Sequence, residues 1–154
     1  IHIRGDIELR SSLIRTLHHE LVHAAWDVEA PSLVLPAWLN EGLAEWFEAR
    51  AVGKRRLAPG EAQAMAQLAS QGQLGSLWNR NSVSFAHLEP EAARSAYLQS
   101  YAFLDFLARR HGDDTLRRLN KTLLRKRKID RAFDLTFGAS LDELVARFAA
   151  EYGS

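Results

Sequence analysis

The chain has 154 residues, of which 47% are hydrophobic and 25% are charged, and its formal net charge is +1. This length and composition fit one globular domain with a sizeable core, and so small a net charge points to no particular partner. The chain has no cysteine, which excludes disulfide scaffolds, cysteine-ligated zinc sites and cysteine nucleophiles.

The sequence shows no targeting or membrane segment. No apolar run reaches the length of a transmembrane helix, and no signal peptide is visible. Because the chain begins with Ile1 rather than Met, we expect a processed product or a domain cut from a larger or extracytoplasmic protein. The sequence indicates neither the compartment nor the oligomeric state.

Residues 1–9 alternate between apolar and polar side chains. This period of two predicts a β-strand. A lone strand is not stable in water, so we expect it to pair in a hairpin at Gly5, with a second copy of the chain in a dimer, or with sequence outside this chain.

The rest of the chain has a helical pattern almost to its end. Serine or proline begins several of the predicted helices, and proline or glycine ends several of them. Residues 71–88 lose the helical period and are predicted to be irregular. The sequence therefore predicts a mainly α fold with an α+β remnant, as a single domain over residues 1–154. The predicted helices run from Ser11 or Ser12 to about Ala30, Ala37 to Ala51, Pro59 to about Ala69, Pro90 to about His111, Asp113 to about Arg127, Ile129 to Phe137, and Ser140 to Tyr152.

The first predicted helix contains the sequence His-Glu-Leu-Val-His at residues 19–23. His19 and His23 are four residues apart, so they lie on one face of the helix and can both bind one zinc ion. Glu20 is offset by one residue and points beside the metal. There it could act as a general base on a water molecule, as metal-assisted hydrolysis of an amide requires.

A catalytic zinc ion needs a third protein ligand and one open position. Glu41 lies early in the next predicted helix, after a loop that lets this helix fold back, and we predict that it is the third ligand. Glu45 lies one turn later, where it could accept a hydrogen bond from a zinc-bound histidine. The metzincin pattern is excluded, because its glycine and histidine positions hold Trp26 and Glu29.

These residues resemble the gluzincin clan of zinc peptidases, and in particular the peptidase MA-like domains related to thermolysin and to the aminopeptidase catalytic domain. The resemblance rests on residues 19–23 and 38–45 and covers residues 10 to 50 well. It implies a zincin-like helical domain that lacks part of its upstream sheet, one Zn²⁺ per chain, and a peptide or protein substrate.

A weaker resemblance involves residues 97–104, which are similar to the aminopeptidase helix that bears a transition-state tyrosine. It implies that Tyr97 donates its hydroxyl to the oxyanion, with Tyr101 as the alternative. Gln99 and Ser100 depart from the lysine and glycine usual there.

Two other functions compete with peptide hydrolysis. A catalytically weak or inactive zinc-binding domain of the same fold could bind peptides or proteins. The basic run between Arg117 and Arg131 could instead bind nucleic acid. We expect no nucleic-acid partner, because leucines at helical spacing make those cations the solvated face of an amphipathic helix.

Overall fold

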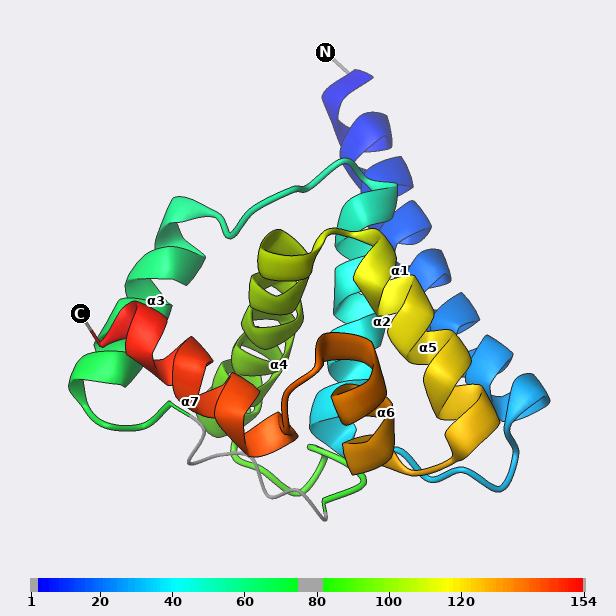
Figure 1. Cartoon of the computed structure of the whole chain (residues 1–154). Helices are drawn as coiled ribbons and strands as arrows, with labels where there is room; N and C mark the ends of the chain where they lie inside the picture. Colours follow the sequence, from blue (N-terminus) through cyan, green and yellow to red (C-terminus); the bar gives the residue numbers. More distant parts are fainter. Residues whose placement is uncertain (1–2, 75–81, 154) are drawn as a thin grey trace.

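The structure is a computed structural model that describes residues 3–74 and 82–153, with side chains from Arg10 onward. This part of the chain folds into seven helices joined by loops (Figure 1). In these ranges no helix combines the length and hydrophobicity that crossing a bilayer requires. The helices are α1 (Ile3–Glu29), α2 (Ala37–Ala51), α3 (Pro59–Ser70), α4 (Pro90–His111), α5 (Asp114–Lys126), α6 (Ile129–Phe137) and α7 (Leu141–Tyr152).

The mainly helical prediction is confirmed, and most predicted boundaries agree with the observed ones to within a residue. The helix ends follow the expected chemistry. Ser140 accepts a hydrogen bond from the backbone N–H of Glu143, whose carboxylate in turn accepts one from the backbone N–H of Ser140. Gly138 ends α6 with a φ of 67°, a left-handed conformation that glycine adopts without strain.

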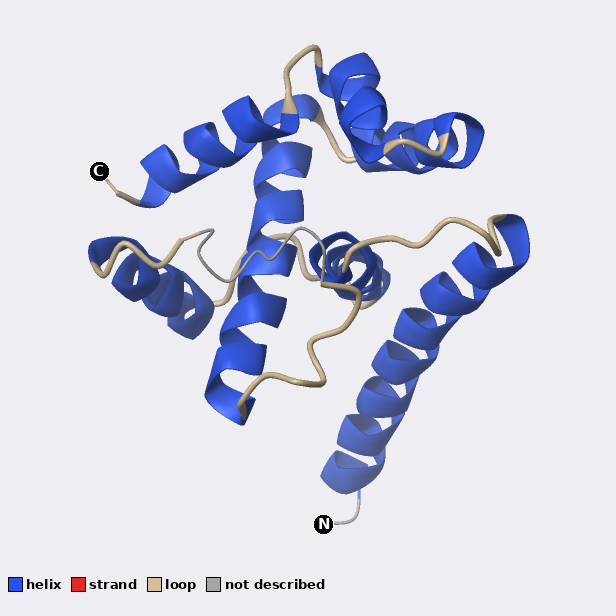
Figure 2. Cartoon of the chain, turned by 90° about the horizontal axis from the view of Figure 1, so that it is seen from below, coloured by secondary structure: helices blue, strands red, loops and turns tan. Residues whose placement is uncertain are grey.

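The predicted N-terminal strand is wrong from Ile3 onward, because α1 already begins at that residue. The described ranges contain no strand at all (Figure 2). A single strand would leave its backbone N–H and C=O groups without partners, whereas a helix satisfies them within the segment. Dimer formation through that strand therefore loses its structural basis.

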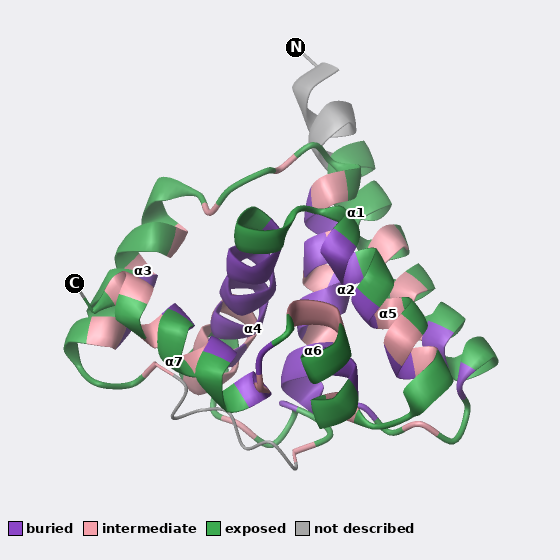
Figure 3. Ribbon diagram, in the orientation of Figure 1, coloured by how far each residue is buried: buried purple, intermediate pink, exposed green. Residues whose placement is uncertain are grey.

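The core lies around α4, which packs against α2 (Figure 3). Leu39 and Leu43 of α2 and Phe103, Leu104 and Leu107 of α4 are all fully buried. Gly42 makes this close crossing possible, because a Cβ atom added there would lie 2.9 Å from the backbone oxygen of Ser100.

Helix α5 covers one side of the core with an apolar face. Leu116, Leu119 and Leu123 are fully buried, while its cations point outward. Arg117 pairs with Asp114, and Arg127 bonds to the hydroxyl of Ser32. This arrangement is the one expected if the basic run is a solvated helix face.

Helix α1 lies at the edge of the molecule and packs against α2. Among its described side chains only Trp26 is buried. Leu13, Leu17, Leu21 and Val28 of this helix are exposed. The face of α1 that meets α2 is therefore largely its polar face, which contains both histidines.

We predict that Gly42→Ala destabilises the protein although alanine is the better helix former by about 1 kcal/mol. The new methyl group must displace the backbone of Ser100 or the side chain of Leu104, and such overpacking costs about 1–3 kcal/mol. Gly60→Ala is the matched control, because it also lies in a helix but has nothing within 4 Å of its added Cβ. Chemical denaturation of both variants checks this, and equal stabilities would contradict it.

Candidate metal centre

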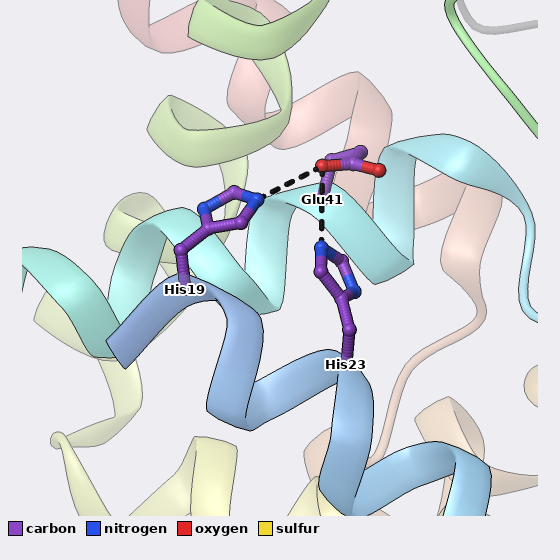
Figure 4. A group of neighbouring side chains, drawn as sticks. All are labelled: His19, His23 and Glu41. Carbon is purple, nitrogen blue, oxygen red and sulfur yellow. Dashed lines mark ion pairs between the residues drawn. The ribbon is translucent and has the colours of Figure 1, made fainter. Parts of the chain in front are cut away.

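Two residues of α1 and one of α2 form the centre of the candidate site. His19 and His23 lie one turn apart on α1, and Trp26, one further turn along, is buried and fixes the rotation of this helix. Helix α2 presents Glu41 to both imidazoles (Figure 4). The structure thus brings together the three ligands that the sequence predicts.

The distances within this group are short and similar. The Glu41 Oε2 atom lies 3.3 Å from His19 Nε2 and 3.6 Å from His23 Nε2. The ligand atoms of these three residues all lie within 4.8 Å of one another, and each side chain is about one-fifth exposed. The group is therefore preformed and still open to solvent on one side.

A zinc ion fits these three atoms. Zinc bonds to nitrogen and carboxylate oxygen are about 2.0–2.2 Å long, so two ligand atoms of a tetrahedral site lie about 3.3–3.6 Å apart. The two distances to Glu41 fall in this range. Two imidazoles and one carboxylate are also a donor set that catalytic zinc sites use.

The other nitrogen of each ring also lies near an oxygen that can accept a hydrogen bond. His23 Nδ1 donates to Asn40 Oδ1 over 3.2 Å, and His19 Nδ1 lies 3.4 Å from Glu48 Oε2. Acceptors at Nδ1 are what a histidine needs to offer its Nε2 lone pair to a metal, so the surroundings of both rings are compatible with metal binding through Nε2.

Sequence reasoning did not identify Asn40, Glu48 or Arg15 as parts of the site. Asn40 directly precedes Glu41, and Glu48 follows it by seven residues, two helical turns along the same face of α2. Arg15 lies one turn before His19 and donates from Nε to Glu48 Oε1 over 2.7 Å. The helical spacing was the available signal for both Arg15 and Glu48.

Glu45 lies between Glu41 and Glu48 on this face of α2 and is half-buried. Its ligand oxygen lies within 4.8 Å of those of His19 and Glu48, but no ion pair joins it to His19 in the described part of the chain. Burial, followed by the negative charge of Glu48, raises the pKa of the Glu45 carboxyl. The structure thus places Glu45 beside the site. Glu48, rather than Glu45, is the carboxylate that lies next to the Nδ1 atom of His19.

Glu20 is exposed on α1 next to His19. Over the described residues, no hydrogen bond or ion pair engages its carboxylate. The carboxylate therefore has no competing partner among the described residues.

The two candidate tyrosines lie in different surroundings. The half-buried Tyr97 packs edge-on against Phe85, and burial and then the charges of Glu41 and Glu45 raise its pKa. Tyr101 is 3% exposed, with its ring under the Lys54 ammonium, and burial raises its pKa to about 12. The negative charge of Glu41, one of the three candidate ligands, thus acts on Tyr97.

Comparison with known proteins identifies one family. No curated protein and no solved structure matches the chain. Residues 13–128, which include every residue of the site described above, match the model of the family described as a protein of unknown function, DUF1570. Since this match spans well over half of the chain, the protein belongs to the DUF1570 family.

Proposed function

We propose that this protein hydrolyses peptide bonds with one zinc ion held by His19, His23 and Glu41. The observation that carries the proposal is the distance of Glu41 Oε2 to the two Nε2 atoms, which equals the edge of a tetrahedral zinc site. The finer assignment, a zincin-like domain of the gluzincin type, rests on the same residues and on the resemblance of residues 19–23 and 38–45 to peptidase MA-like domains.

His19, His23 and Glu41 would hold the zinc ion, which when bound would supply a Lewis acid for the scissile carbonyl and would lower the pKa of a bound water to about 7. Glu20 takes the proton of the attacking water as general base and then passes it to the leaving amine. Its exposed carboxylate, with no competing partner among the described residues, suits this role.

Tyr97 donates its hydroxyl hydrogen to the carbonyl oxygen as that oxygen gains negative charge. The position of α4 supports this assignment. The backbone of Ser100, one turn after Tyr97, packs closely against Gly42, which directly follows Glu41. This crossing brings the part of α4 around Ser100 close to the part of α2 that contains Glu41.

The first test measures the zinc content and peptide cleavage of the wild type and of Glu20→Gln. We expect about one zinc per chain in both, with cleavage reduced by roughly 10²–10⁴ in the variant, because general-base catalysis contributes that much. Metal analysis and cleavage of a diverse peptide library provide the two measurements. Glu29→Gln, an exposed glutamate elsewhere on α1, is the matched control and should match the wild type in both.

Two results would contradict the proposal in different ways. A wild-type protein that contains no zinc, although prepared without chelator, would refute the metal site. A wild-type protein that holds zinc but cleaves no peptide would refute the hydrolase and favour the zinc-binding interaction domain.

A second test compares Tyr97→Phe with Tyr101→Phe. We expect Tyr97→Phe to lower kcat about 10²-fold or more while zinc content stays unchanged, because it removes a donor that acts on developing charge. Tyr101→Phe should leave kcat unchanged, since the Tyr101 side chain is buried beneath the Lys54 ammonium. Equal kcat values for Tyr97→Phe and the wild type would rule out this role of Tyr97.

A further inference from the structure

The two histidines of the ligand group are held by different kinds of acceptor. The neutral amide oxygen of Asn40 lies 3.2 Å from His23 Nδ1, whereas a carboxylate oxygen of Glu48 lies 3.4 Å from His19 Nδ1. A carboxylate is the stronger acceptor and makes the imidazole more electron-rich than an amide does. The two rings are therefore supported unequally.

The Glu48 carboxylate is buried, with 7% of the residue exposed. Its two oxygens are divided between two partners, since Oε1 accepts from Arg15 Nε at 2.7 Å and Oε2 faces His19 Nδ1. A buried carboxylate is costly unless it is paired. Arg15 therefore pairs with the Glu48 carboxylate and holds it in the orientation in which its second oxygen faces His19.

Helical spacing brings these three side chains together. Arg15 and His19 are separated by one turn of α1, so both point toward α2. Glu48 lies two turns after Glu41, so α2 presents one carboxylate to each side of the His19 ring. The ring is held between Glu41 at Nε2 and Glu48 at Nδ1.

Glu45 does not share this arrangement. It lies nearer to Glu41 along the chain, but no hydrogen bond or ion pair involves it within the described ranges. It is also a carboxylate at a similar place on α2, which makes it a matched reference for Glu48.

We infer that Glu48, anchored by Arg15, is the positioning residue for His19 and sets the zinc affinity of the site. This inference rests on the proposed zinc site. Glu48 acts through His19 and touches neither metal nor substrate. Arg15 acts one step further away, through Glu48, so that a half-exposed residue outside the His-Glu-Leu-Val-His segment controls the strength of the metal centre.

The experiment measures the zinc dissociation constant of the purified chain by competition with a chelator of known affinity. Glu48→Gln should weaken zinc binding about 10–100-fold, the range typical of residues that orient metal ligands. Glu45→Gln removes the same charge from the same face of α2 and should change the affinity by less than about 3-fold. Asn40→Ala serves as a reference for the loss of support at His23.

Arg15→Met tests the anchor and keeps the inference testable if Glu48→Gln does not fold, because the Arg15 side chain is half-exposed. We expect it to weaken zinc binding, and we expect Arg15→Met combined with Glu48→Gln to be no weaker than Glu48→Gln alone. Such non-additivity is what a residue acting only through Glu48 must show. The visible spectrum of the Co²⁺-substituted protein, which reports ligand geometry, should change in Glu48→Gln and stay unchanged in Glu45→Gln.

Several outcomes would overturn the inference. A larger loss of affinity in Glu45→Gln than in Glu48→Gln would transfer the role to Glu45. Unchanged affinity in Arg15→Met, or additive losses in the double variant, would remove the anchor. A wild-type chain that binds no zinc would overturn the proposed function as well, whereas tight wild-type binding with an unaffected Glu48→Gln would overturn this inference alone.

Discussion

The candidate metal centre depends on the packing of a polar face of α1 against an acidic face of α2. Glu41, Glu45 and Glu48 all lie along one side of α2, and three partly desolvated carboxylates in a row repel one another. The imidazoles of α1 and the Arg15 guanidinium offset this repulsion. The interface between the two helices and the candidate metal centre are thus one set of contacts.

Much of the helical fold was predictable from the sequence, because proline, serine and glycine mark the ends of α2, α3, α4, α6 and α7. The ligand group was predictable too, since spacings of four residues specify a helix face directly. The contact of Glu48 with His19 was not predictable. Helical spacing puts Glu45 and Glu48 on the same face of α2, but it does not say which of them reaches the His19 imidazole. The answer depends on how closely α1 and α2 pack, which is decided by the tertiary structure and not by local sequence.

The strand prediction, which fails from Ile3 onward, has a related cause. Alternation of apolar and polar residues indicates a strand only where a partner strand can complete the hydrogen bonds. The same limit applies to Leu13, Leu17 and Leu21, whose spacing marks an apolar face but does not say that α2 covers it. In the structure α2 instead covers the histidines, and these leucines are exposed. An apolar stripe predicts the presence of a helix better than it predicts which side is buried.

Because α1 contributes only Trp26 to the buried core among its described side chains, polar contacts must hold most of it in place. A metal ion that joins His19 and His23 to Glu41 would cross-link α1 to α2, and ligand binding to the folded state adds directly to stability. The α2–α4 packing at Gly42 buries far more apolar surface and needs no such help. The stability of the protein is therefore unevenly distributed, with a rigid α2–α4 centre that carries Glu41 and a more weakly attached helix that carries the histidines. In such an arrangement the metal affinity depends on how well α1 is positioned before the metal binds. Arg15 and Glu48 can therefore affect the metal affinity without touching the metal.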